Sequence, residues 1–194
     1  MKSNESNGWL EPFKKTTTSF KDERGEFSPL IIVNGIEFDL YQVNTVSTDK
    51  PYTFRGMHWQ EKPYMQSKLI RCLFGSIIDF VIDIRDGSPN YGKLYTFNLN
   101  DKNDWVYIPR GFAHGYLTLP HNLGSTYPTL VEYFVNNEYN KDSERGIVLT
   151  TEIIDIINKE LPMGTELIIN DRDLSWPTIN EINSNFKYEC RTNK

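Results

Sequence analysis

The chain has 194 residues, which is enough for one domain with a well-buried core and too few for two ordinary domains. Hydrophobic residues make up 38% and charged residues 24%, and no apolar run approaches the roughly 18 residues that a membrane-spanning helix needs. The net charge of −5 argues against a nucleic-acid-binding surface, although a few basic side chains would suffice to hold one phosphorylated ligand.

The amino-terminal residues 1–9 are polar and lack the succession of basic, apolar and small residues that marks a secretory signal. We therefore expect a soluble protein in the cytoplasm. Cys72 and Cys190 are too few and too far apart for a disulfide framework or a zinc site, so we expect two free thiols. His58 and His114 stand alone, without a His-x-His pair or a carboxylate at ligand spacing, and we expect no metal site.

Residues 38–139 contain short apolar or alternating runs, separated by clusters of Gly, Pro, Asn and Asp, at the spacing of an antiparallel sandwich or barrel. The clearest runs in chain order are 67–74, 77–84 and 93–99, and turn residues lie between them. This pattern predicts an all-β domain, but it does not give the order in which the strands pair.

One helix is predicted over residues 150–160, where Thr150 or Thr151 can act as the N-cap and isoleucines recur at helical spacing. Such a helix would lie at the periphery of the sheets. We interpret residues 1–194 as a single domain, with the barrel core at about 38–139 and a C-terminal segment, 140–194, that packs on it.

Lys68 is the first candidate for a functional side chain. Residues two apart in a strand share a face, so Lys68 shares its face with Ile70, Cys72 and Phe74. If that face lines the barrel, an ammonium group lies at its mouth. The alternative is that a lone lysine near a strand end extends its amine into water.

Arg55 and His58 lie one short span before Lys68, so basic side chains are concentrated in this part of the sequence. Histidine is the usual general base near neutral pH, and arginine makes bidentate contacts with phosphate oxygens. An isolated histidine can equally be a half-buried, hydrogen-bonded structural residue. His114, in a turn bracketed by Pro and Gly that leads into a strand, carries the same two interpretations.

Tyr133 and Tyr139 are six residues apart, so an unbroken strand would present both on one face. Either tyrosine could be an ordinary core or rim aromatic. Tyrosine also donates protons and stacks on nucleotide bases.

Taken together, these segments resemble the dTDP-4-dehydrorhamnose 3,5-epimerase family, whose members act on nucleotide sugars. The resemblance covers most of the chain in order and implies an all-β, double-stranded β-helix, which is the cupin-type jelly-roll barrel, with a short peripheral helix or helices. The matching segments are 22–25, 42–44, 55–60, 66–71, 79–89, 108–115, 133–147 and 170–177.

The resemblance also implies a role for each candidate. His58 would be the base that removes a proton, Asp173 the carboxylate that orients it, and Tyr133 the acid on the opposite sugar face. Lys68 would stabilise the developing oxyanion, and Tyr139 would stack on the base of the nucleotide. The positions that would contact the nucleotide sugar are Arg24, Gln42, Asn44, Arg55, His114, Glu144 and Arg172.

The chemistry that this assignment implies is proton abstraction beside a ketone. A carbonyl at C4 acidifies the hydrogens on C3 and C5, because the resulting carbanion delocalises onto oxygen, and a base and an acid on opposite faces invert each carbon. No cofactor is needed. The family also implies a homodimer in which the amino-terminal segment completes the partner's sheet, so that Arg24 would act across the interface.

Several positions depart from the family pattern. Pro29 stands where a glutamate usually helps to hold the nucleotide, and Arg172 stands where a lysine usually precedes the orienting carboxylate. Two alternatives to a 3,5-epimerase therefore stay open. One is an epimerase that acts at C3 or C5 alone or on another nucleotide-activated 4-keto sugar, and the other is a non-catalytic sugar-nucleotide binding module.

Overall fold

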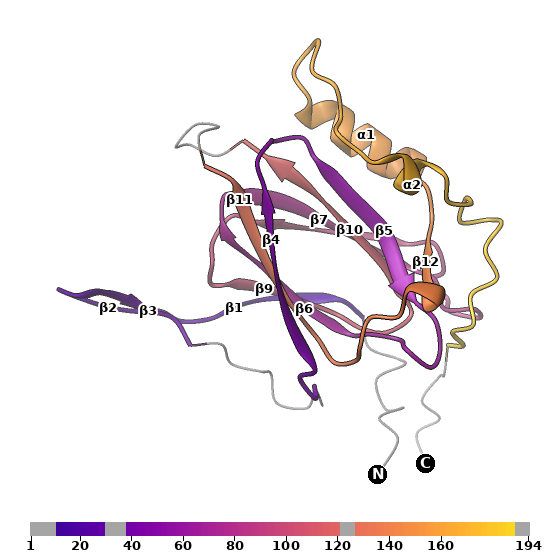
Figure 1. Cartoon of the computed structure of the whole chain (residues 1–194), viewed down its shortest axis with the longest axis horizontal. Helices are drawn as coiled ribbons and strands as arrows, with labels where there is room; N and C mark the ends of the chain where they lie inside the picture. The colour runs from indigo at the N-terminus through magenta and orange to yellow at the C-terminus, as the bar shows by residue number, and fades with distance from the viewer. Residues whose placement is uncertain (1–10, 30–37, 121–126, 189–194) are drawn as a thin grey trace.

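The computed structural model describes residues 11–29, 38–120 and 127–188 of the chain, and it is dominated by antiparallel strands (Figure 1). The strands are β1 (Phe13–Thr16), β2 (Phe20–Asp22), β3 (Gly25–Phe27), β4 (Gln42–Thr48), β5 (Phe54–Gln60), β6 (Lys68–Phe74), β7 (Ser76–Asp83), β8 (Leu94–Leu99), β9 (Asp104–Ile108), β10 (Phe112–Leu119), β11 (Thr129–Val135) and β12 (Glu144–Gly146). The helices are the 3-10 turn η1 (Lys141–Ser143), α1 (Thr151–Glu160) and α2 (Asp171–Leu174). The three strands predicted most clearly are thus confirmed as β6, β7 and β8.

Two five-stranded sheets build the barrel. The first sheet has the order β1-β9-β6-β11-β4, and the second has the order β12-β5-β10-β7-β8, with all of their pairings antiparallel. Strands that are distant in the sequence are therefore neighbours, as in a jelly roll. The predicted fold class is confirmed: the protein is an all-β jelly-roll barrel with two short helices at its periphery (Figure 1).

The second sheet is buried on both faces, because side chains alternate along its strands. In β7, Ile77 and Val81 join the cluster between the two sheets, whereas Ile78, Phe80 and Ile82 point to the other face. That other face is covered by α1 and the C-terminal segment. The side chains that cover it most deeply are Ile147, Ile153, Ile157 and Phe186.

The predicted helix is confirmed as α1. The Thr150 hydroxyl accepts a hydrogen bond from the backbone N–H of Ile153, which is the N-cap contact that the sequence indicated. Ile153 and Ile157 are the buried residues of the helix, and α1 ends at Glu160. Cys72 is a buried free thiol, while Cys190 lies outside the described residues.

The hairpin formed by β2 and β3 stands apart from the two sheets. Its strands pair only with each other within the described ranges, and it extends away from the barrel (Figure 1). Phe20 and Phe27 stack across the hairpin and remain largely exposed. No described helix is long and apolar enough to cross a membrane, and no three described His, Cys, Asp or Glu side chains are grouped as metal ligands.

Candidate active site

A cavity of about 230 Å³ opens between the two sheets at the edge where β4 lies opposite β5 and β12. Side chains from both sheets and from the α2 segment surround it. The lining residues are Val46, Arg55, His58, Lys68, His114, Tyr116, Tyr133, Glu144, Asn170, Arg172 and Asp173. The structure thus brings together eight of the twelve predicted site residues, although they come from six separate elements.

His58 is held by Asp173. The Nε2 atom of His58 lies 2.8 Å from Oδ1 of Asp173, and Oδ2 of Asp173 accepts a hydrogen bond of 3.2 Å from the backbone N–H of Gly56. Burial acts to raise the pKa of Asp173, but the hydrogen bond and charge of His58 outweigh it and keep this pKa below its usual value. The ionised carboxylate therefore fixes the proton of His58 on Nε2 and leaves Nδ1 free to accept another.

Local sequence explains how Asp173 reaches this position. The side chain of Asn170 caps α2 by accepting a 2.7 Å hydrogen bond from the backbone N–H of Asp173. The resulting single turn points Asp173 at β5 while the rest of α2 stays exposed, and Asp173 itself is only 1% exposed.

Lys68 and Tyr133 lie on the other wall of the cavity, on β6 and β11 of the first sheet. Burial lowers the pKa of Lys68 from 10.5 to about 8, against the opposing charges of Asp79 and Glu144. Burial raises the pKa of Tyr133, and although Arg55 lowers it, the net direction is upward. At neutral pH the cavity therefore holds an ammonium group and a protonated phenol opposite the imidazole of His58.

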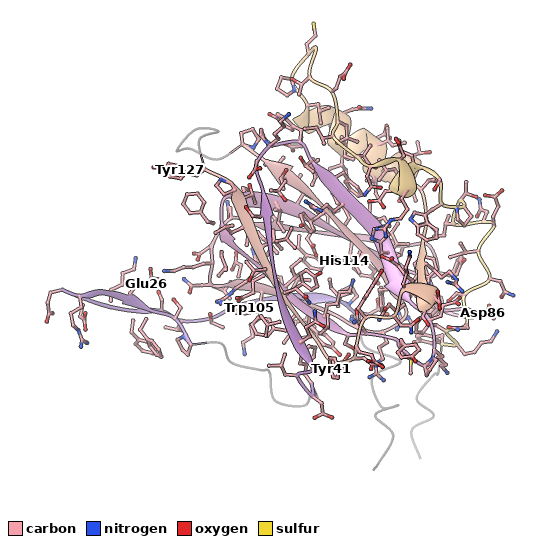
Figure 2. All side chains as sticks on the ribbon, viewed as in Figure 1. Glu26, Tyr41, Asp86, Trp105, His114 and Tyr127 are labelled. Atoms are coloured by element: carbon pink, nitrogen blue, oxygen red, sulfur yellow. The ribbon has the colours of Figure 1, made fainter. Side chains whose placement is uncertain are left out.

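His114 forms a second buried pair, with Nε2 lying 2.6 Å from Oδ1 of Asp79. Figure 2 shows His114 deep in the body of the barrel. Burial lowers the pKa of His114 despite the opposing effect of Asp79, so the imidazole is neutral near pH 7. The sequence prediction missed Asp79 as a site residue; the signal that could have found it is its position as the one carboxylate within the apolar run 77–82.

Glu144 connects two of the predicted binding residues. Its Oε2 atom accepts a 2.9 Å hydrogen bond from the Tyr139 hydroxyl and lies 3.0 Å from Nη1 of Arg172. Its Oε1 atom lies 3.9 Å from Nδ1 of His58. The guanidinium of Arg172 also places Nε 3.5 Å from Oδ1 of Asp173, so it spans two carboxylates where a lysine would offer only one nitrogen.

A second cavity of about 250 Å³ adjoins the first at Tyr133. Gln42, Asn44 and Tyr139 line it, together with Gln66 and Val135. The strand that would present Tyr133 and Tyr139 on one face is not continuous, because β11 ends at Val135. The chain instead turns after β11, and Tyr139 reaches the second cavity from that turn.

Arg24 is the predicted residue that the structure does not bring to either cavity. It lies at the turn of the β2–β3 hairpin, its side chain is 83% exposed, and it pairs with Asp22 at 2.5 Å. Figure 2 shows Glu26 of the same hairpin far from His114. Within a single copy of the chain, Arg24 therefore has no contact with the site.

The chain is similar to known proteins over most of its length. Residues 11–181 match the family described as dTDP-4-dehydrorhamnose 3,5-epimerase. A dTDP-4-dehydrorhamnose 3,5-epimerase from Sinorhizobium fredii is 33% identical over 175 residues, which cover 87% of this chain and 85% of the relative.

Two solved structures share the fold closely. An epimerase from Legionella pneumophila, in complex with dTDP-4-keto-L-rhamnose, superposes with a TM-score of 0.78 and 25% identity over 92% of this chain and 94% of that one. An epimerase from Bacillus anthracis, with TDP and pyrophosphate bound, gives a TM-score of 0.73 and 28% identity over 87% of this chain and 94% of that one. The chain therefore belongs to the dTDP-4-dehydrorhamnose 3,5-epimerase family.

Proposed function

We propose that this protein is an isomerase that inverts C3 and C5 of dTDP-4-dehydro-6-deoxyglucose, towards dTDP-L-rhamnose. The observation that carries the proposal is the arrangement of His58 on one wall of the cavity and Tyr133 and Lys68 on the other. Inversion requires a base and an acid on opposite faces of the sugar, and this cavity supplies both.

The reaction begins when Nδ1 of His58 removes the proton from the carbon beside the C4 ketone. The electron pair of the broken C–H bond moves into the ring and onto O4, where the Lys68 ammonium stabilises the enolate oxygen. The Tyr133 hydroxyl then delivers its proton to the opposite face of the carbon as the carbonyl reforms. His58 loses the abstracted proton to water and the phenolate regains one, so atoms and charge balance and no cofactor takes part.

The nucleotide diphosphate would extend from the first cavity into the second. Arg55 and Arg172 line the first cavity and offer guanidinium groups for the phosphate oxygens. Tyr139 borders the second cavity and presents an exposed ring on which a base can stack. The ligands bound in the Bacillus anthracis and Legionella pneumophila structures are of this chemical class.

Our proposal includes a homodimer of single-domain chains, with the expected location in the cytoplasm. The β2–β3 hairpin exposes Phe20 and Phe27, and the edge strand β4 leaves backbone groups on one side unpaired by any described strand. A second copy that covers these surfaces would carry its Arg24 towards the site of the first copy. Size-exclusion chromatography with light scattering tests this arrangement, and a monomer would contradict it.

The alternative of a single-carbon epimerase is supported by Pro29, which follows β3 and lacks the carboxylate expected at that position. One experiment separates the alternatives: proton NMR of the purified protein with dTDP-4-keto-6-deoxyglucose in deuterated water. Loss of both the C3 and C5 proton signals supports the 3,5-epimerase, and loss of one supports the single-carbon enzyme. If neither proton signal is lost and the protein still binds the sugar nucleotide tightly, the result supports a non-catalytic binding module.

A further inference from the structure

The indole ring of Trp176 lies directly on the backbone of Gly146, the last residue of β12. A Cβ atom added to Gly146 would lie 2.6 Å from Nε1 of Trp176 and 2.7 Å from Cδ1, which is closer than atoms can pack. Gly146 does not have a positive φ, so its backbone conformation would accept any residue. The glycine is therefore required here by the ring that covers it.

This contact lies beside the catalytic pair. Gly146 is the cross-strand partner of His58 in the pairing of β12 with β5. The ring of Trp176 meets the ring of His58 edge-on, with the centroids 6.2 Å apart and an interplanar angle of 68°. Trp176 also follows α2 by two residues, so one side chain connects the strand of His58 to the turn that carries Asp173.

The α2 turn buries little of its own surface. Asp173 is its one buried residue, and Arg172 makes its contact with Glu144 from a half-exposed position. Beyond α2, the carbonyl of Pro177 accepts a 3.0 Å hydrogen bond from the backbone N–H of Val148. Ile169 and Ile179, on either side of α2, pack against the apolar cluster of the second sheet, and between them Trp176 is the aromatic side chain that contacts β12. Trp176 lies outside the cavity lining.

The Trp176 ring acts through its shape. Its Nε1 atom is buried and has no hydrogen-bond partner among the described residues. An unpaired buried donor costs free energy, so hydrogen bonding does not explain why an indole occupies this site. Packing against Gly146 does explain it, because a flat ring fits where no side chain projects from the strand.

We propose that Trp176, seated on Gly146, is a positioning residue that holds the carboxylate of Asp173 on Nε2 of His58. The inference deepens the proposed function and rests on it, since it treats His58 as the base. Trp176→Ala is expected to lower kcat by about tenfold to a hundredfold with little change in KM, because a displacement of about 1 Å in a catalytic group has effects of this size. Trp176→Phe retains a ring over Gly146 and should restore most of kcat.

Gly146→Ala tests the same contact from the other side, because the added methyl group must displace the ring. Its effect on kcat should resemble that of Trp176→Ala, and it should add nothing in the double variant, where no ring is left to displace. The matched control is Leu174→Ala, which removes a 56% exposed side chain from the same turn and should leave kcat at the wild-type value.

A spectroscopic measurement tests the positioning without any substrate. A ring N–H held by a carboxylate exchanges slowly and gives a downfield proton NMR signal, and the His58–Asp173 and His114–Asp79 pairs should each give one. His58→Asn assigns the first signal. Trp176→Ala and Gly146→Ala should lose that signal and keep the signal of His114, which serves as the internal control for an intact barrel.

Two outcomes would overturn the inference. One is a Trp176→Ala variant that retains both kcat and the His58 signal, and the other is the loss of both signals together, which would mean that Trp176 supports the fold as a whole. If the wild type has the His58 signal but no epimerase activity on any 4-keto sugar nucleotide, the proposed function fails while the positioning contact stands.

Discussion

Replacing Lys68 with methionine is expected to stabilise the fold while it disables the site. Burial lowers the pKa of Lys68 from 10.5 to about 8, against the attraction of Asp79 and Glu144. Each pKa unit corresponds to about 1.4 kcal/mol, so this shift amounts to about 3 kcal/mol of unfavourable free energy in the folded state. Because Lys68 is half-buried and partly screened by water, we expect Lys68→Met to raise the free energy of unfolding at pH 7 by about 1 to 3 kcal/mol.

The stabilisation should depend on pH with a definite sign. The pKa of Lys68 in the folded chain is lower than in the unfolded chain, so the folded chain binds fewer protons between about pH 8 and 10.5. The stability of the wild type therefore rises with pH in this window relative to that of the methionine variant. The gain from Lys68→Met is fully present below pH 8 and should vanish above pH 10.5.

Urea unfolding at pH 7 and at pH 10.5, followed by circular dichroism, measures both effects. Lys68→Arg is the matched control, because arginine keeps its charge throughout this range and should give no gain at either pH. A methionine variant that is no more stable than the wild type at pH 7, or that shows the same gain at both pH values, would refute the reasoning.

The same residue predicts how activity depends on pH. Only the ammonium form of Lys68 stabilises the enolate oxygen, so solvent deuterium uptake should decline as the pH rises through about 8. Burial raises the pKa of Tyr133 above 10.0, so the tyrosine does not titrate in this range. A pH–rate profile checks the assignment, and the decline should be absent from the residual activity of Lys68→Arg.

Three further predictions concern the other site residues. His58→Asn should reduce deuterium uptake at C3 and C5 by about 10²- to 10⁴-fold in the NMR assay, the usual contribution of a general base. Tyr133→Phe should keep deuterium uptake at the attacked carbon but slow its inversion, because His58 can return a proton to the original face. Equal loss of uptake and inversion in the NMR assay would contradict the assigned order, in which His58 acts before Tyr133. Arg24→Ala should raise KM severalfold in the dimer, whereas Glu23→Ala at the neighbouring exposed position should not, and initial-rate kinetics compares the two.

Local patterns in the sequence predicted the elements whose structure depends on local rules. The threonine cap and the spacing of the isoleucines located α1 to within one residue. Strand parity placed Lys68 on the same face as Ile70 and Cys72, and these two side chains do belong to the cluster between the sheets. Parity alone left both interpretations of Lys68 open, and the placement of Lys68 in the cavity comes from the structure.

Contacts between distant strands were beyond such rules. Asp79 reaches His114 only because β7 pairs with β10, and the sequence does not give that pairing order. The pairing of β10 with β5 shifts register between His114 and Tyr116, which alternation within one strand cannot indicate. The spacing of Tyr133 and Tyr139 could not show that β11 ends at Val135, because the end of a strand depends on the turn that follows it.

Some site residues lie on strands that are paired on both sides, and others lie at the margins of the sheets, on edge strands or outside the sheets. β5, β6 and β11 each have a paired strand on both sides, so hydrogen bonds fix Lys68 and Tyr133 relative to each other in the first sheet and hold His58 in the second. The apolar cluster between the sheets then holds the two sheets against each other. Gln42 and Asn44 lie on the edge strand β4, and Glu144 lies on the edge strand β12. Margins tolerate substitution better than paired strands do, because fewer backbone hydrogen bonds depend on them.

Two of the departures from the family pattern, Pro29 and Arg172, fall in this marginal part. Pro29 follows the isolated β2–β3 hairpin, and Arg172 lies on the exposed face of α2. Neither residue lies on β5, β6 or β11, the strands that carry the base, the cation and the acid, although Arg172 contacts Glu144 and Asp173 beside His58. We therefore expect proton transfer at the carbon beside the ketone to follow the chemistry of the family, while recognition of the nucleotide differs. Measuring kcat and KM for one 4-keto sugar attached to different nucleotides separates these two properties.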